Sequence, residues 1–343
     1  MKTVLVTGSA GFIGAALVER LLDRQEVASI VGLDNLNGYY DPALKEYRLR
    51  RIEEHYSSLI AGSTRNLQYR FIKGDITDRE LVDRLFAEHK FDIVVNLAAQ
   101  AGVRYSVENP DVYVESNVIG FYNILEACRR HPVEHLVYAS SSSVYGGNKK
   151  VPFSVEDKVD DPVSLYAATK KSNELFASCY SKLYGIPTTG LRFFTVYGPA
   201  GRPDMAYFGF TDKLVLGGKI QIFNYGNCER DFTYIDDIVE GIVRVMAKAP
   251  AGHALYNIGG GQPVGLPDFV QTLQEELVRA GVLPADYDFE AHKELVPMQP
   301  GDVPVTYADA SALERDFGFT PKTTLREGLR KFAEWYREYY RTA

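Results

Sequence analysis

The stretch TVLVTGSAGFIG, residues 3–14, joins a short apolar run to a glycine-rich turn. Gly8, Gly11 and Gly14 fall at GxxGxxG spacing, and the residues that follow have the pattern of a helix. Glycines in such a turn let the backbone approach a pyrophosphate, and the helix N-terminus stabilises its negative charge. The stretch therefore predicts the first βαβ unit of a dinucleotide-binding fold. The alternative is that the glycines serve only as turns and helix caps.

An acidic residue at the end of the next apolar run, SIVGLD, favours one cofactor over another. Asp34 follows Gly14 by about 20 residues, where a carboxylate accepts hydrogen bonds from ribose hydroxyls and repels a 2′-phosphate. We therefore expect NAD rather than NADP. The candidate cofactor-binding residues are Gly8, Gly11, Phe12, Ile13, Gly14, Asp34, Asn35, Asp75, Ile76, Ala98, Ala99 and Gln100, with Tyr166 and Lys170 described below.

Apolar runs alternate with helix-like segments along the first part of the chain. This alternation is typical of βαβ units and predicts an α/β fold with a Rossmann-like, doubly wound parallel sheet. We expect a NAD-binding domain over 1–190, with a helical insertion at about 36–66, and a smaller C-terminal α/β substrate-binding domain over 191–343. The chain could cross between the two more than once. The expected strands are 2–7, 28–33, 68–73, 92–97, 134–139 and 187–194, and two long helices are expected at 109–131 and 164–184.

Composition excludes several classes of function. The chain has 343 residues and a net charge of −7, without a basic cluster, which argues against a nucleic-acid partner. No segment has the roughly 20 uninterrupted apolar residues that a membrane span needs. Three cysteines, Cys128, Cys179 and Cys228, lack the spacing of metal ligands, so we expect reduced thiols in the cytoplasm and no metal.

A tyrosine and a lysine in YAATK, residues 166–170, are the candidate catalytic pair. Tyr166 and Lys170 are four residues apart on a predicted helix, and therefore share one face. Many surface helices carry such a pair in solvent, but this one follows the fifth strand and a serine-rich turn that contains Ser141. A tyrosine base at neutral pH needs a pKa shift of about 3 units, roughly 4 kcal/mol, which a neighbouring ammonium and a positive nicotinamide ring could supply.

At this point the sequence resembles the extended short-chain dehydrogenases/reductases that act on nucleotide sugars. Within that family it is most similar to the branch that epimerises UDP-glucuronate at C4, and this branch is indicated by LDNLNGYYDPALK, AAQAGVRYS and FFTVYGPAGRPDMA. The resemblance implies reversible conversion to UDP-galacturonate through a 4-keto sugar, with bound NAD taking and returning a hydride. It rests on the motifs TGSAGFIG, NLAAQAGVRYS, ASSSSVYG, YAATK, LRFFTVYGPAGRPDMA, RDFTYIDD and QPGDVPVTYAD.

The resemblance also implies roles for individual residues. Tyr166 would be the base, Lys170 its electrostatic support and a ligand of the nicotinamide ribose, and Ser141 the serine of the catalytic triad. For Arg104 and Asn117, near the substrate, ordinary salt-bridge and helix-surface roles stay open. A homodimer through the two long helices is implied as well. The remaining substrate candidates are Ser142 and Ser143 against the sugar, Thr195 against the uronate carboxylate, Arg202 and Arg230 at the nucleotide and its diphosphate, and Phe223 on the uracil.

Related dehydratases and decarboxylases carry an acid just before the Val-Tyr-Gly of the serine turn. Here Ser142 and Ser143 occupy that region, and no Asp or Glu stands between Ser140 and Tyr145. A carboxylate there would repel the C6 carboxylate of the substrate, whereas hydroxyls can donate to it. Turn chemistry alone accounts for Ser140. Three alternatives remain: a 4-epimerase for the neutral pair UDP-glucose and UDP-galactose, a UDP-glucuronate decarboxylase, and an NAD(H)-binding sensor without turnover.

Overall fold

The computed structural model describes residues 1–298 and 304–342, and it divides the chain into two compact units. The first unit contains residues 1–148, 155–193 and 239–256, and the second contains 149–154, 194–238 and the chain from 257 onward. A single cut near residue 190 therefore does not describe the organisation. The segment 149–154 belongs to the second unit, and the segment 239–256 returns to the first.

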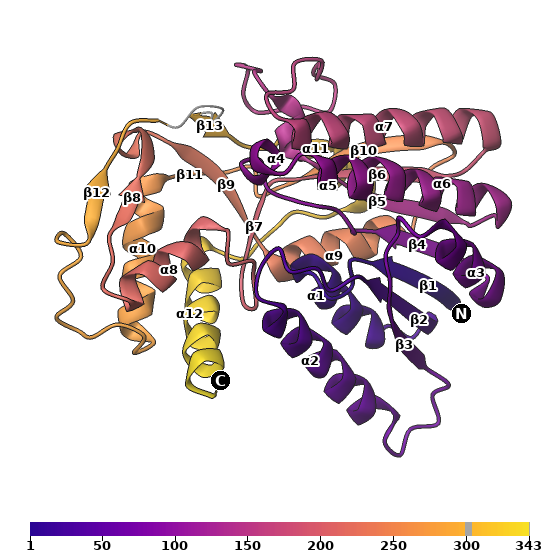
Figure 1. Ribbon diagram of the computed structural model, residues 1–343, viewed down its shortest axis with the longest axis horizontal. Coiled ribbons are helices and arrows are strands. Elements are labelled where there is room, and N and C mark those ends of the chain that lie inside the picture. The colour runs from indigo at the N-terminus through magenta and orange to yellow at the C-terminus, as the bar shows by residue number, and fades with distance from the viewer. Residues whose placement is uncertain (299–303, 343) are drawn as a thin grey trace. The chain divides into compact units, whose positions relative to one another are not determined.

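Within the described residues, the first unit is built on a seven-stranded sheet with strand order β10-β6-β5-β4-β1-β2-β3 (Figure 1). The strand pairings from β3 through β6 are all parallel. The order reverses between β1 and β4, where parallel α/β sheets bind their ligands at the carboxyl ends of the strands. The α/β class and the Rossmann-like sheet are thus confirmed. The strands are β1 (Lys2–Thr7), β2 (Val27–Asp34), β3 (Gln68–Lys73), β4 (Ile93–Asn96), β5 (His135–Ser141), β6 (Thr188–Phe193) and β10 (His253–Ile258).

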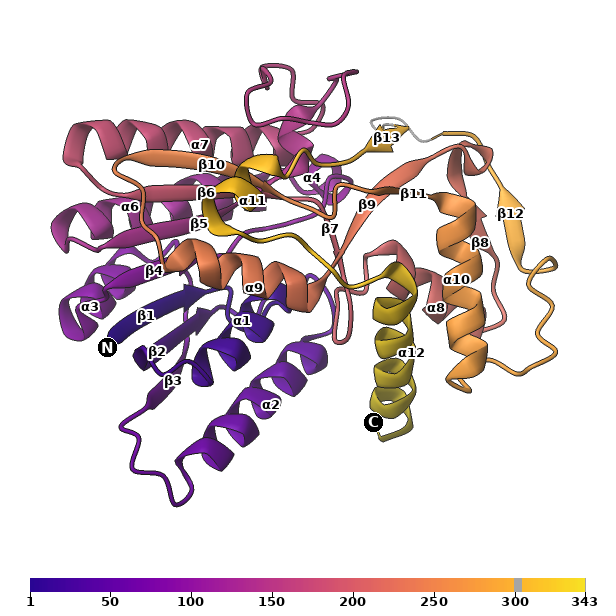
Figure 2. The same ribbon diagram turned by 180° about the vertical axis from the view of Figure 1, so that it is seen from behind.

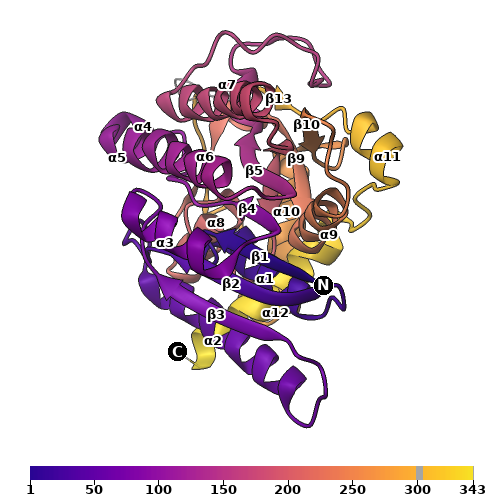
Figure 3. The same cartoon turned by 90° about the vertical axis from the view of Figure 1, so that its right-hand side faces the viewer.

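Helices cover both faces of this sheet. Figure 3 shows α3 (Arg79–His89), α6 (Phe121–Arg130) and α7 (Leu165–Tyr184) on one face, with α1 (Phe12–Leu22) and α9 (Ile235–Met246) on the other. The core between the sheet and the first of these layers is apolar, because central strands buried on both faces carry continuous β-branched and leucine runs. Its members include Leu5, Val31, Val94, Leu136, Phe86, Phe121 and Ile124.

The expected helix at 109–131 is not one continuous α-helix. The chain forms α4 (Tyr105–Glu108), α5 (Asp111–Tyr113), a π-helical segment (Val114–Gly120) and then α6. A π-helix hydrogen-bonds from i to i+5 and is recognised by backbone geometry rather than by apolar periodicity, so the sequence pattern did not indicate it. The second long helix, α7, matches its expected range to within one residue.

The second unit has smaller sheets and its own helices. Strand β9 (Glu229–Tyr234) pairs with β7 (Thr195–Tyr197), β11 (Pro263–Gly265) and β13 (Val305–Thr306), while β8 (Ile220–Ile222) pairs with β12 (Lys293–Leu295). Figure 2 shows α10 (Leu266–Arg279) beside α12 (Leu325–Thr342). The second unit also contains α8 (Ala206–Val215) and α11 (Ser311–Phe317).

The expected helical insertion is α2 (Pro42–Ile60), which belongs to the first unit.

None of the helices in the described part of the chain is both long enough and apolar enough to cross a membrane.

Candidate active site

The glycine turn between β1 and α1 is packed so tightly that side chains would not fit. A Cβ on Gly14 would lie 2.0 Å from the Gly8 carbonyl oxygen, and one on Gly8 would lie 2.8 Å from the Ala98 nitrogen. Gly8 also has a φ of +68°, which glycine adopts without strain. Gly11 is the N-cap of α1 and has no side chain to cap the first N–H groups of the helix. These groups are suited to an anion such as a pyrophosphate.

Asp34, Asn35 and Asp75 lie together at the carboxyl ends of β2 and β3. The buried carboxylate of Asp34 accepts hydrogen bonds from the backbone N–H groups of Ala10 (3.1 Å) and Leu36 (2.8 Å), which fixes it beside the glycine turn. The Asn35 amide donates to Asp75 Oδ2 at 2.7 Å. Acceptor positions remain on the Asp34 carboxylate, since each oxygen offers two lone pairs.

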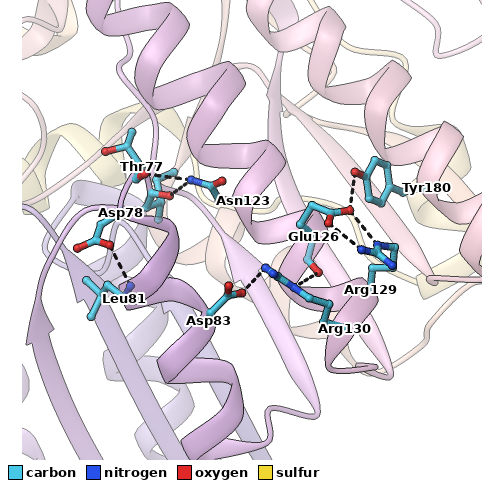
Figure 4. Close-up of polar contacts among 10 residues, drawn as sticks. Thr77, Asp78, Leu81, Asp83, Asn123, Glu126, Arg129, Arg130 and Tyr180 are labelled. Atoms are coloured by element: carbon cyan, nitrogen blue, oxygen red, sulfur yellow. Dashed lines mark hydrogen bonds and ion pairs between the residues drawn. The ribbon is translucent and has the colours of Figure 1, made fainter.

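The Asp75 turn is itself held from two sides. Burial alone would raise the pKa of Asp75, but hydrogen bonds from the backbone and hydroxyl of Thr77 and from the Asn35 side chain lower it below its usual range. On the other side, the Asn123 side-chain amide of α6 donates to the backbone carbonyl groups of Ile76 and Thr77, the two residues that follow Asp75 (Figure 4). Asp75 is therefore an ionised and oriented acceptor at neutral pH.

The insertion also touches the glycine turn. Arg48 of α2 is buried, and its guanidinium donates to the Ala10 carbonyl at 3.0 Å and to the Tyr40 hydroxyl at 2.6 Å. Lys45, one turn earlier, is also buried and donates to the backbone and side-chain oxygens of Asn37, both at 2.9 Å. These contacts fix the loop after Asp34, and the sequence alone did not assign them.

The loop after β4, which carries Ala98, Ala99 and Gln100, is tied to its neighbours by buried polar side chains. Thr7 Oγ1 donates to Asn96 Oδ1 and accepts from the Ala98 backbone N–H. Asn117, in the π-helical segment, accepts from the Gln100 N–H at 2.8 Å and donates to the Gln100 carbonyl at 3.0 Å. Asn117 is 1% exposed, so the helix-surface role considered for it is wrong.

Asn117 also connects this loop to the helix that carries the candidate catalytic pair. Its side-chain amide donates to Thr169 Oγ1 at 3.0 Å, and its backbone carbonyl accepts from the Asn173 side-chain amide at 2.7 Å. Both partners are on α7. The π-helical segment therefore couples the expected cofactor loop to the face of α7 on which Tyr166 and Lys170 lie.

Tyr166 and Lys170 share the face of α7 that packs against β5. Lys170 is buried, its ammonium donates to the Ala139 carbonyl at 2.9 Å, and burial lowers its pKa to about 8. Tyr166 is half-buried, and its ring packs edge-on against Tyr113, with 6.1 Å between the centroids. Tyr113 in turn donates to the carbonyl oxygens of Ala101 and Gly102.

The serine run forms the end of β5 and a 3-10 helix (Ser142–Tyr145). Ser141 is the N-cap: its Oγ accepts from the Ser143 backbone N–H at 3.2 Å and from the Ser143 hydroxyl at 2.9 Å. The side chains of Ser141, Ser142 and Ser143 are half-buried. Ser140 is different, because it is buried and donates to Glu174 at 2.7 Å, so turn chemistry is not its role.

The remaining substrate candidates are in the second unit, apart from Arg104, which is exposed at the start of α4 in the first. Thr195 begins β7, and Phe223 begins a short 3-10 helix (Phe223–Gly226). Arg202 makes a two-pronged ion pair with Asp204, at 3.0 and 2.5 Å. Arg230 donates to the carbonyl oxygens of Glu229 and Pro304. The start of QPGDVPVTYAD, residues 299–303, lies outside the described residues.

A family comparison decides what the chain belongs to. The model of the NAD dependent epimerase/dehydratase family matches residues 4–259. The chain belongs to that family. The resemblance drawn from the motifs is thereby confirmed, and so is the assignment to a NAD-dependent class of enzymes.

Three relatives show which members of the epimerase/dehydratase family this chain is similar to. UDP-glucuronate 4-epimerase 4 of Arabidopsis thaliana is 46% identical over 355 residues, covering 98% of this chain and 76% of that protein. The structure of UDP-glucuronic acid 4-epimerase from Bacillus cereus with UDP-glucuronic acid and NAD has a TM-score of 0.85 and 31% identity, covering 98% of this chain and 100% of that one. A UDP-glucose 4-epimerase structure from Thermotoga maritima, with UDP-glucose, has a TM-score of 0.81 and 29% identity, covering 98% and 99%.

Two charged residues of this family member were not among the sequence candidates. Glu174 of α7 and Arg192 of β6 form a buried ion pair directly behind the serine turn. Glu174 is one helical turn beyond Lys170, so the spacing Tyr166, Lys170, Glu174 was a usable signal. An arginine inside the apolar strand TTGLRF was a second signal, because a buried charge requires a partner.

Among the described residues, no group of three or more His, Cys, Asp or Glu side chains is arranged to hold a metal ion.

Proposed function

We propose that this protein is a NAD-dependent 4-epimerase that interconverts UDP-glucuronate and UDP-galacturonate through a transient 4-keto sugar. The observation that carries the proposal is the joint presence of a half-buried Tyr166, a buried Lys170 and a serine turn without an acid, all in the first unit. The relationship to the Arabidopsis and Bacillus cereus enzymes supports the choice of substrate. An NAD(H)-binding sensor without turnover would not need a catalytic base, so the presence of Tyr166 and Lys170 argues against that alternative.

The residues around the glycine turn fit NAD. The turn has no room for side chains, the start of α1 offers N–H groups, and the carboxylate of Asp34 is held where ribose hydroxyls are expected. We assign NAD binding to this turn, to the Asp34, Asn35 and Asp75 cluster and to the loop 98–100. When bound, NAD supplies a two-electron acceptor that is regenerated in each turnover.

Tyr166 is the proposed base. Its phenolate takes the proton of the C4 hydroxyl during oxidation and returns it to the same oxygen when C4 is reduced from the opposite face of the ring. The ammonium of Lys170 stabilises the phenolate, and Ser141 donates to the reacting oxygen. The shift needed in the Tyr166 pKa corresponds to about 4 kcal/mol, which a charge within a few ångströms can supply in a partly dry site.

The serine turn is proposed to prevent decarboxylation. Oxidation at C4 leaves a β-keto acid, which loses CO₂ readily once its carboxylate bond stands perpendicular to the carbonyl plane. Hydroxyls at Ser142, Ser143 and Thr195 can donate to the carboxylate and restrain that rotation, whereas an acid at the turn would repel it. The UDP-glucuronate decarboxylase alternative is disfavoured for the same reason.

The substrate brings about three negative charges, so the nucleotide end of the proposed site needs placed cations. Arg202 and Arg230 are the candidates, because a guanidinium can bind two phosphate oxygens at once. Arg202 already pairs with Asp204, so phosphate binding exchanges or shares that partner. Phe223 is proposed to stack on the uracil, and Arg104 remains a weaker candidate.

Two further parts of the proposal concern the whole protein. The exposed apolar side chains on the π-helical segment, α6 and α7 support a homodimer through these helices; they include Val114, Ile119, Tyr122, Leu175, Leu183 and Tyr184. The three cysteines, all within the described residues, are free thiols, in keeping with a reducing cytoplasm.

The deciding experiment incubates the purified protein with UDP-glucuronate, without added cofactor, and follows the products by NMR. UDP-galacturonate should form, and deuterium placed at C4 should stay in the sugar because the hydride never leaves the protein. Faster turnover of UDP-glucose would select the neutral-sugar epimerase instead. Formation of UDP-xylose would select the decarboxylase, and no turnover of either UDP-sugar would refute the proposal.

A further inference from the structure

The ion pair between Glu174 and Arg192 is among the most deeply buried polar contacts of the first unit. Both side chains are 1% exposed, and the guanidinium donates to the two carboxylate oxygens at 2.8 and 2.9 Å. Lys171 makes a longer contact with the same carboxylate, at 3.5 Å. The role proposed above for α7 uses Tyr166 and Lys170 and leaves this pair without a function.

The pair holds both ends of the serine turn. On one side, the Ser140 hydroxyl donates to Glu174 Oε1 at 2.7 Å, immediately before Ser141. On the other, Arg192 Nη1 donates to the Tyr145 hydroxyl at 3.0 Å, and its guanidinium lies 4.9 Å from the centroid of the Tyr145 ring. The turn that carries Ser141, Ser142 and Ser143 is thus bracketed by contacts to one ion pair.

The same pair fixes the turn relative to the catalytic helix. Glu174 is one turn after Lys170 on the face of α7 that packs against β5. The Lys170 ammonium donates to Ala139, the residue before Ser140. Since Arg192 comes from β6, the strand that pairs with β5 in register Ser140 with Arg192, three elements meet at this point.

Stability does not explain why the pair is there. Taking two charges out of water is unfavourable, and apolar residues of similar volume at such places often give an equally stable or more stable protein. Apolar residues cannot, however, hold a serine hydroxyl and a tyrosine hydroxyl in fixed directions. We propose that Glu174 and Arg192 are positioning residues, which place the serine turn so that Ser141 meets the oxygen on which Tyr166 acts.

This inference rests on the proposed epimerase activity, and its first test is the double variant E174L/R192M. We expect the variant to fold, since both charges are removed together, with unchanged NAD content and an unchanged KM for UDP-glucuronate. We expect kcat to fall about 10- to 100-fold, since small misplacements of catalytic groups cost factors of this size. A double variant with the original kcat would overturn the inference.

A double-mutant cycle separates positioning from a general structural role. In a S141A background the same two substitutions should lower kcat less than about threefold, because the hydroxyl that they misplace is already gone. A pair that only supports the fold would lower kcat by the same factor in both backgrounds. If E174L/R192M does not fold, the pair R192K and E174Q enters the same cycle, since either change removes the two-pronged contact.

A matched control disrupts a different ion pair on the same side of the sheet. Glu126 of α6 accepts from Arg129 at two 2.9 Å contacts and from the Tyr180 hydroxyl (Figure 4). E126Q should lower stability while leaving kcat within about twofold. A loss of kcat equal to that of E174L/R192M would assign both effects to the fold and contradict the inference.

A measurement that does not depend on turnover tests the positioning role of Glu174 and Arg192 separately from the proposed epimerase activity. Amide hydrogen exchange of residues 140–146 should be at least about tenfold faster in E174L/R192M, with the amides of α7 unchanged. Unchanged exchange at the turn refutes the positioning role, whatever the activity. An unaltered protein that is inactive on UDP-glucuronate refutes the proposed function and leaves the exchange result to decide on the pair.

Discussion

Lys170 is the residue whose environment says most about the proposed chemistry. It is buried at 3% exposure, with its ammonium on the Ala139 carbonyl, and burial lowers its pKa to about 8. A lysine with an ordinary pKa, about 10.4, stays charged throughout the neutral pH range. With a pKa of about 8, Lys170 loses the charge that is proposed to support Tyr166 within a measurable pH range.

The pH dependence of kcat follows from that shift. A lysine is charged below its pKa and neutral above it, so kcat for epimerisation should fall as the pH rises through about 8. K170R, whose guanidinium stays charged, should lose this alkaline fall even if its kcat is lower. K170M should have a kcat lower by roughly 10²-fold or more. A rate that is flat to pH 9.5 in the unaltered protein would contradict this account.

Loss of a hydroxyl at Ser142, Ser143 or Thr195 should change which product forms, and not only how fast it forms. S142A, S143A and T195A should each increase the fraction of UDP-4-keto-pentose, because fewer donors restrain the carboxylate of the 4-keto sugar. S143A should also lower kcat, since Ser143 donates to Ser141. Products are quantified by NMR after complete turnover. Variants that only epimerise more slowly would show that the restraint is not the function of these hydroxyls.

The regular elements were predictable because their signals are local. Helix α7 has Ser164 as its N-cap, with the hydroxyl accepting from the Ala167 N–H, and Gly185 in a left-handed conformation at its end. Strands β1 and β3 were predicted with their observed limits, since apolar runs bounded by turns are strong signals. The π-helical segment was not predictable, because the buried hydrogen bonds of Asn117 are made to residues distant in the sequence.

Asn117 should matter to the loop that it holds. N117A removes three side-chain hydrogen bonds, to Gln100 and Thr169, and should lower the free energy of unfolding by about 2–3 kcal/mol. It should also lower the amount of NAD that copurifies, because the loop 98–100 loses its anchor. Urea titration and the NAD released on denaturation measure the two effects.

The control for this change is N148A. Asn148 donates one exposed hydrogen bond, to the Lys158 carbonyl, and its loss should change the free energy of unfolding by no more than about 0.5 kcal/mol. Equal NAD content in N117A and N148A would show that Asn117 does not support the cofactor loop.

The division into units was only partly accessible from sequence. The fold class follows from the alternation of the first six strands, which the sequence shows directly. The seventh strand of the sheet, β10, comes from residues 253–258 and follows β7, α8, β8, β9 and α9 in the chain, so its place beside β6 depends on pairing between distant segments. The candidate site divides in the same way. The glycine turn and the Tyr166 face carry motifs, whereas Glu174 and Arg192 each leave a signal in the sequence but are seen to pair with each other only once β6 and α7 are packed.

The proposed homodimer makes a prediction about the intact protein. Leu183 and Leu175 of α7 are 67% and 58% exposed, which is unusual for two leucines on one helix and favours burial against a second copy. The unaltered protein should sediment as a dimer and L175D/L183D as a monomer. L216D, at the 85% exposed Leu216 of the second unit, is the control and should leave the mass unchanged. A monomeric unaltered protein would refute the dimer.

The return of the chain to the first sheet has a consequence for how the protein is made. Until β10 has been translated, β6 is the outer strand and presents unpaired backbone groups, a template for misassociation between nascent chains. A gene fragment that stops at residue 193 leaves that edge open permanently. Expression of such a fragment should therefore yield aggregates, and supplying a peptide that contains residues 239–258 in trans should increase the recoverable yield.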